Sequence, residues 1–89
     1  MPTVWIPSLI RNLTGGIDKV TVPGNTVGQV IEELEQRHPG IKSRLCDDQG
    51  LRPGIAVAVD TQISRLGFLQ PVSENSEVHF LPAVSGGQE

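Results

Sequence analysis

Hydrophobic residues alternate with polar or small residues in several short segments, a period-two pattern that is typical of β-strands. Residues 3–10 begin in this way, with Val4 and Ile6 on one side, and Val20 and Val22 repeat the pattern after a Gly15-Gly16 turn. We therefore expect a β-hairpin at the start of the chain. The segments that predict further strands are residues 55–59, residues 62–64 at a sheet edge and residues 77–81.

Between these strands the hydrophobic spacing becomes helical. Residues of the expected buried stripe recur three or four positions apart, and they are Val27, Val30, Ile31 and Leu34. Thr26, with Gln29 three positions later, matches a capping box at the start of this helix. Pro39-Gly40 is expected to end it near His38, because proline disfavours the helical conformation in the residue before it.

The order of elements predicts an α+β fold. Residues 41–46 favour a short helical turn and residues 47–50 a polar loop. The chain then reads strand, strand, helix, strand, a short edge strand and a final strand that Pro82 should end. A mixed sheet of about four to five strands over one main helix is the ubiquitin-like β-grasp arrangement. We expect residues 1–82 to form this domain and residues 83–89 to form a flexible C-terminal tail.

The alternation also assigns residues to the two faces of the predicted sheet. If the larger apolar set faces the helix, the opposite, outer face carries Trp5, Ala56, Ala58, His79 and Leu81. An exposed tryptophan and leucine with polar neighbours are good anchors for a partner protein, so we expect partner binding at these residues. Scattered exposed apolar residues, which are ordinary in monomers, are the alternative interpretation.

Length and charge exclude several classes of function. With 89 residues the chain has room for one modest core but not for an elaborate enclosed active site, so we expect no enzyme activity of its own. The net charge of −3, without a run of Lys and Arg, argues against nucleic-acid binding. No apolar run has the length of a membrane span, and the first residues lack a secretory pattern. We expect a cytoplasmic protein without a membrane partner.

The histidines and the cysteine do not form a recognisable metal or catalytic motif. His38 and His79 have no further ligand at metal-binding spacing within their own elements, and His38 fits a helix-capping role. Cys46 follows Ile41 and Leu45 at apolar spacing, which favours a small buried side chain over a persulfide carrier. We therefore expect no catalytic residue, no metal site and no bound cofactor.

The end of the sequence contains the most informative motif. Two successive glycines lack side chains, reach most backbone conformations and can enter a narrow active site of another enzyme. Gly86-Gly87 follow a leucine-proline-alanine-valine-serine run, and the chain as a whole resembles the small ubiquitin-like sulfur carriers of the MoaD/ThiS family, most closely its CysO-like branch. The segments that carry the resemblance are Val57-Ala58-Val59-Asp60, Gly67-Phe68-Leu69-Gln70-Pro71-Val72, residues 77–87, Val4-Trp5-Ile6-Pro7, Leu13-Thr14-Gly15-Gly16 and Thr26-Val27-Gly28-Gln29-Val30-Ile31.

The resemblance implies a chemistry at Gly87. A carboxylate is a poor electrophile, and in the family a ubiquitin-activating-type adenylyltransferase joins it to AMP from ATP. A sulfur nucleophile then replaces AMP and leaves a thiocarboxylate, from which a sulfur-acceptor synthase takes the sulfur. The CysO-like branch implies cysteine synthesis, whereas molybdopterin or thiazole synthesis would use the same tail chemistry. In the family the outer sheet face meets the activating enzyme, and ATP is a substrate of that partner.

Gln88 and Glu89 depart from the simplest family members, which end at the second glycine. While the amide between Gly87 and Gln88 is intact, Gly87 has no carboxylate that ATP can activate. We expect a peptidase to remove both residues, and a JAMM-type zinc enzyme of the kind associated with such carriers is the candidate. A cloning remnant is the alternative origin of the extension.

Two other functions are compatible with the same sequence. A ubiquitin-like modifier would be adenylated in the same way and then joined through Gly87 to lysines of target proteins. A non-covalent interaction module would use the outer sheet face and would not need the diglycine.

Overall fold

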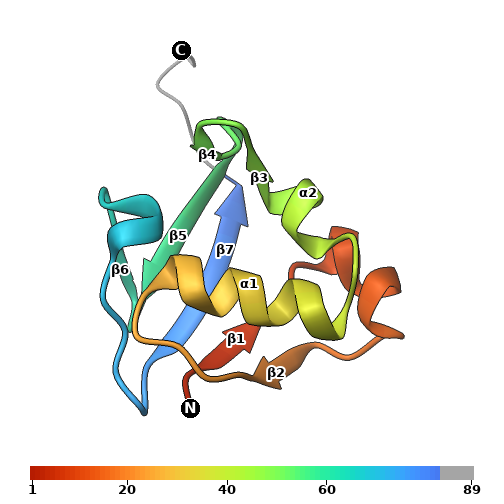
Figure 1. Cartoon of the computed structure of the whole chain (residues 1–89), viewed down its shortest axis with the longest axis horizontal. Helices are drawn as coiled ribbons and strands as arrows, with labels where there is room; N and C mark the ends of the chain where they lie inside the picture. The colour runs from red at the N-terminus through yellow and green to blue at the C-terminus, as the bar shows by residue number, and fades with distance from the viewer. Residues whose placement is uncertain (83–89) are drawn as a thin grey trace.

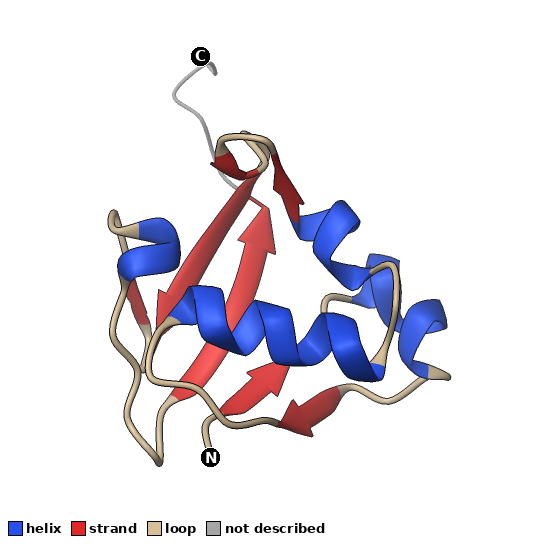
Figure 2. Cartoon of the chain, viewed as in Figure 1, coloured by secondary structure: helices blue, strands red, loops and turns tan. Residues whose placement is uncertain are grey.

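The computed structural model describes residues 1–82, and residues 83–89 lie outside the described part. The elements in chain order are β1 (Thr3–Trp5), the 3-10 helix η1 (Ser8–Thr14), β2 (Lys19–Thr21), α1 (Val27–Arg37), α2 (Ile41–Leu45), β3 (Cys46–Asp47), β4 (Gly50–Leu51), β5 (Ile55–Val59), β6 (Gln62–Ile63), the 3-10 helix η2 (Gly67–Leu69) and β7 (Glu77–Pro82). Figure 1 shows α1 lying across one face of the sheet, and Figure 2 shows the shorter helices around its margins.

The main sheet has five strands in the order β2-β1-β7-β5-β6. The first and last strands, β1 and β7, pair in parallel at its centre, and the other three pairings are antiparallel. A parallel pair requires a long crossover between its strands. Here the crossover includes α1, which covers one face of the sheet. This mixed sheet on one main helix is the predicted β-grasp arrangement.

Helix α1 confirms the prediction from spacing and capping. The Gln29 backbone N–H donates to Thr26 Oγ1 at 3.3 Å, and the Asn25 backbone N–H donates to Gln29 Oε1 at 2.8 Å. The first bond is the N-cap half of the predicted capping box, whereas the second reaches Asn25, one residue before the N-cap Thr26. The helix ends at Arg37, just before Pro39. Its buried residues are the predicted four, Val27, Val30, Ile31 and Leu34.

The connection between β1 and β2 differs from the extended pattern predicted for residues 3–10. The pairing of the two strands is confirmed, but β1 already ends at Trp5 and η1 follows. Pro7 has no N–H with which to continue a ladder, and Ile10 in η1 is buried in the core instead. The helix η1 leads into Gly15-Gly16, whose φ angles of 68° and 90° confirm the predicted positive-φ turn.

A small second sheet replaces the polar loop predicted at residues 47–50. β3 and β4 pair antiparallel, with Cys46 opposite Leu51 and Asp47 opposite Gly50. The Gln49 backbone N–H donates to Asp47 Oδ1 at 2.9 Å and so stabilises the turn between the two strands. Two residues per strand are too few to produce a visible alternation in the sequence.

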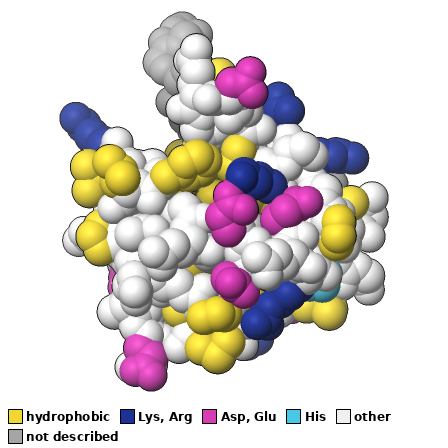
Figure 3. Space-filling model, in the orientation of Figure 1, with side chains coloured by type: hydrophobic (Ala, Val, Ile, Leu, Met, Phe, Trp, Pro, Cys, Tyr) yellow, Lys and Arg dark blue, Asp and Glu magenta, His cyan; other side chains and the backbone are white. Residues whose placement is uncertain are grey.

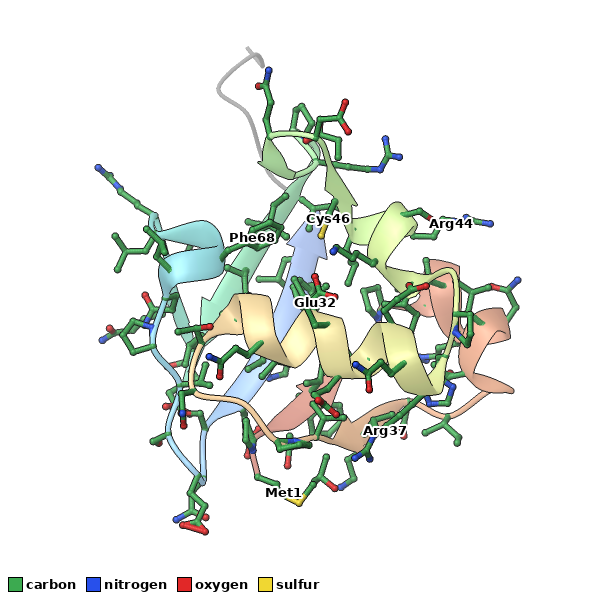
Figure 4. The ribbon with its side chains drawn as sticks, in the orientation of Figure 1. Met1, Glu32, Arg37, Arg44, Cys46 and Phe68 are labelled. Atoms are coloured by element: carbon green, nitrogen blue, oxygen red, sulfur yellow. The ribbon has the colours of Figure 1, made fainter. Side chains whose placement is uncertain are left out.

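The inner face of the main sheet and the helices above it form one core. Val4, Val57 and Val78 from the three central strands are fully buried there. Cys46 is 6% exposed and belongs to the same core, which confirms its predicted packing role. Figure 4 places Cys46 between α2 and the sheet. Within residues 1–82, no helix has the length and apolar character that a membrane crossing requires.

Candidate functional site

The register of the strands places the predicted outer-face residues in two rows. The first row runs across all five strands of the main sheet and consists of Lys19, Trp5, His79, Ala58 and Ile63. The second row consists of Leu81 and Ala56. Residues opposite each other on paired strands project from the same side of a sheet. The two rows therefore form one surface, the outer face, which is turned away from the viewer in Figure 1.

Trp5 is held in place at the centre of the outer face. Its ring stacks on His79, with the ring centroids 5.5 Å apart and the planes 7° from parallel. Its indole Nε1–H donates to Glu77 Oε1 at 3.2 Å, and Lys19 Nζ lies 5.3 Å from the ring centroid. A cation above an aromatic ring is attracted by its π-electrons. These contacts order a large amphipathic side chain before any partner arrives, which lowers the entropic cost of binding.

The outer face differs from the prediction at Ala58. Ala58 lies on the predicted side, but it is only 4% exposed, because its methyl group sits between the larger side chains of His79 and Ile63 in the same row. Ala58 therefore supplies the floor of the surface and little contact area. Ile63, which the sequence did not single out, is 66% exposed in that row. The sequence signal that could have identified Ile63 is the two-residue turn between β5 and β6, because this turn places Ile63 opposite Ala58.

The second row lies beside the last described residue of the chain. Leu81 is 38% exposed and is followed by Pro82, the last residue of β7. The predicted reaction residues Gly86 and Gly87, and the predicted cleavage point before Gln88, lie outside residues 1–82. Gly87 is six residues after Leu81, a span of at most about 20 Å for an extended chain. A protein that handles Gly87 is therefore within reach of the outer face.

The opposite, helix-covered face shows charged side chains whose contacts are internal. Figure 3 shows acidic and basic groups next to one another over α1. Lys42 in α2 pairs with Glu32 in α1, and this hydrogen bond raises the pKa of Lys42. The Glu35 carboxylate accepts the backbone N–H groups of Gly40 and Lys42. These contacts join α1 to α2. The charges of Glu32, Glu35 and Lys42 therefore have a structural role.

The described residues offer no alternative reactive centre. Among residues 1–82, no group of three or more His, Cys, Asp and Glu side chains is arranged to hold a metal ion. Burial raises the pKa of the Cys46 thiol, and the nearby Lys42 ammonium opposes that effect. A buried thiol with a raised pKa is a poor nucleophile at neutral pH. Cys46 is therefore unsuited to carrying sulfur while the chain is folded.

Comparisons with known proteins agree with the fold. The chain matches the ThiS family over residues 4–87. It is 36% identical over 90 residues to the sulfur carrier protein CysO of Mycobacterium tuberculosis, with 96% of this chain and 97% of the relative covered.

Solved structures of two kinds of protein are similar to the chain. One is a chain of the Amycolatopsis orientalis BexX/CysO complex, with a TM-score of 0.89, 38% identity, and coverage of 98% of this chain and 100% of that chain. Another is the small archaeal modifier protein SAMP1 of Haloferax volcanii, with a TM-score of 0.70, 27% identity, and coverage of 97% of this chain and 98% of that chain. These matches cover nearly the full length of the chain. They agree with the sheet order and the single main helix described above. The chain therefore belongs to the ThiS/MoaD family of ubiquitin-like sulfur carrier proteins.

Proposed function

We propose that this protein carries sulfur as a thiocarboxylate on Gly87, formed after Gln88 and Glu89 have been removed, and that it supplies cysteine biosynthesis. The observation that supports this most strongly is the match to the ThiS family over residues 4–87, which includes the diglycine. The similarity to CysO proteins favours cysteine over molybdopterin or thiazole as the product.

The proposed reaction has two steps at the carbonyl carbon of Gly87. The Gly87 carboxylate attacks the α-phosphorus of ATP, so that pyrophosphate leaves and a mixed anhydride with AMP forms. Hydrosulfide then attacks the carbonyl carbon and AMP leaves, which produces the thiocarboxylate directly. Both steps take place on a partner adenylyltransferase of the ubiquitin-activating type. In this proposal the chain is a substrate and not an enzyme, and it binds no cofactor of its own.

The outer face is the proposed docking surface for that adenylyltransferase. Trp5 and Leu81 supply apolar area, while Lys19, His79 and Glu77 supply polar groups around Trp5. An ordered aromatic side chain with a polar rim is the usual composition of a binding hot spot. A CysO protein occurs in a solved complex with BexX, which supports partner binding as a property of similar chains.

Removal of Gln88 and Glu89 is the proposed first step. The Gly87 carbonyl is part of an amide in the full chain, and an amide has no carboxylate oxygen to attack ATP. A JAMM-type zinc peptidase is the proposed processing enzyme. A sulfur-acceptor synthase is the proposed final partner. We also propose that the protein acts in the cytoplasm. In this proposal residues 1–82 constitute its β-grasp domain and residues 83–89 its reactive tail.

The test compares two chains, residues 1–87 and residues 1–89, incubated with the cognate adenylyltransferase, ATP and a sulfide source. Intact mass should show one carboxyl oxygen replaced by sulfur in the shorter chain and no change in the longer one. Adenylation of the 1–89 chain without cleavage would contradict the precursor step. Failure of the 1–87 chain to form either adenylate or thiocarboxylate would contradict the carrier function.

A second candidate is a ubiquitin-like protein modifier, which the similarity to SAMP1 favours. It would share adenylation at Gly87 and differ in the final acceptor, a lysine amine. High-mass conjugates that survive thiol treatment of a cell extract would support the modifier. A free chain with a thiocarboxylate would support the carrier. Partner binding that is unaffected by deletion of Gly86 and Gly87, with no modified species in the cell, would instead support a non-covalent module.

A further inference from the structure

A second feature lies next to the end of β7 and shares one residue, Leu81, with the second row of the outer face. It is a cleft of about 260 Å³ between η1, α2 and the ends of β5 and β7, named here the β7 cleft. Six of its lining residues are Pro7, Ile10, Arg44, Leu45, Ile55 and Phe80. The cleft exists because β1 ends at Trp5, so that the last residues of β7 have no strand beside them on that edge.

The β7 cleft is suited to a single apolar side chain. Its walls are apolar except at Arg44, which is exposed and, in Figure 4, projects from α2 away from the protein body. Pockets for small molecules usually have volumes of about 300 to 1,000 Å³, and this cleft is smaller. One large aliphatic or aromatic side chain of a partner protein therefore matches its size better than a cofactor does.

One arginine lines the β7 cleft and two more are anchored beside it. Arg11 follows Ile10 of the lining, and its Nε–H donates to the Ile6 carbonyl at 3.0 Å. The Arg52 Nε–H donates to the carbonyl of Ser43, the residue before Arg44, also at 3.0 Å. Arg44 belongs to the cleft lining itself, whereas Arg11 and Arg52 are anchored beside it, and Arg52 also borders a separate hollow with Asp47 and Asp48. The three arginines are far apart in the sequence, so the sequence shows no basic run.

The position of the β7 cleft links it to the tail. Leu81 lines the cleft and also belongs to the second row of the outer face. Gly87 is within about 20 Å of Leu81 along an extended chain. A protein that holds Gly87 in its active site can therefore contact both sides of the end of β7 at once.

We infer that the β7 cleft is a second docking site for the adenylyltransferase, and that it accepts an apolar side chain flanked by carboxylates on that enzyme. This inference rests on the proposed function. The apolar side chain fills the cleft, and the carboxylates pair with Arg44 and its basic neighbours. Such a contact would fix the direction in which the tail leaves the domain, whereas the outer face alone holds only one side of β7.

Gly54 provides a test that leaves the core intact. It lines the β7 cleft and is exposed, no atom lies within 4 Å of an added Cβ, and its backbone is outside the strained positive-φ region. Gly54→Trp places bulk over the cleft without removing a buried contact. Its matched control is Asn75→Trp, at an exposed position that precedes β7 and so lies at the other end of that strand. Arg44→Glu tests the charge, and its control is Arg65→Glu at an exposed position beside η2.

The measurement is the KM of the cognate adenylyltransferase for chains 1–87, followed by pyrophosphate release, with the folding of each variant verified by circular dichroism. Gly54→Trp and Arg44→Glu should each raise KM about tenfold, and both controls should leave KM within about twofold. Unchanged KM for both cleft variants, with normal activation of the unmodified 1–87 chain, would overturn the inference and leave the carrier function standing. Absence of activation in the unmodified chain would instead refute the carrier function. A change in oligomeric state of Gly54→Trp on sedimentation, with KM unchanged, would overturn the inference by assigning the cleft to a second copy of the chain.

Discussion

The two faces of the main sheet are made by the same strands but differ in what holds their side chains. On the inner face Val4 and Val78 are fully buried, and their contacts are with the core beneath α1. On the outer face Trp5 and His79 stack on each other and are bound by Glu77, and both side chains stay partly exposed. One face therefore supplies stability and the other is organised for binding. Substitutions on the two faces should separate these effects.

The largest expected effect is in the core between the inner face and α1. Leu34→Ala removes a fully buried side chain from α1 and leaves a cavity, which should lower the free energy of unfolding by about 3 kcal/mol. Leu81→Ala on the outer face is the matched control and should change it by less than about 1 kcal/mol, since that side chain is partly exposed. Urea denaturation followed by circular dichroism measures both. Equal losses would show that the outer face also carries the fold.

The next effect concerns binding. Trp5→Ala should weaken the complex with the adenylyltransferase by about 1–2 kcal/mol, because it removes the ordered aromatic anchor of the outer face. The melting temperature should change little, since the ring is only partly buried. Calorimetric titration of the 1–87 chain gives the affinity. If Trp5→Ala and wild type bind equally well, the outer face is not the docking surface.

A third prediction concerns the turn that positions Ile63 at the end of the first row. Asp60 and Thr61 form the two-residue turn between β5 and β6 with φ angles of 52° and 72°, a left-handed conformation that is strained for a β-branched threonine. Thr61→Gly should relieve that strain and stabilise the fold by about 1 kcal/mol. A lower melting temperature than wild type would show that Thr61 makes contacts that outweigh the strain.

The smallest expected effect is a pH dependence of the folding stability that arises from Cys46 in the core. Burial raises the pKa of the Cys46 thiol above that of the unfolded chain. The protonated thiol is therefore favoured by folding, and stability should fall as the pH rises from the unfolded pKa of about 8.5 through the higher folded value. In Cys46→Ala the stability should fall less steeply over this pH range, because the thiol is absent. Denaturation midpoints at pH 7.5 and at pH 10 for both chains test this, and parallel declines would refute it.

The sequence predicted those helices and strands whose signal lies within one short segment of the chain. Thr26 and Gln29 identified the start of α1 because the capping bonds join residues close in the chain. The alternation at Val57 and Val78 identified strands whose inner faces are buried. The 3-10 helix η1 was missed because Ile6 and Ile10 suit an extended strand as well as a helical turn, and the packing of Ile10 decides between them.

The sequence by itself determined the β-grasp class, the helix α1, the side of each outer-face residue and the diglycine at Gly86-Gly87, because these depend on local spacing and residue type. Only the tertiary structure decided which of those residues are accessible. It buried Ala58 between His79 and Ile63, stacked Trp5 on His79, and brought Arg11, Arg44 and Arg52 around the β7 cleft. Accessibility and charge clustering depend on contacts between residues far apart in the chain, and local periodicity contains no information about those distances.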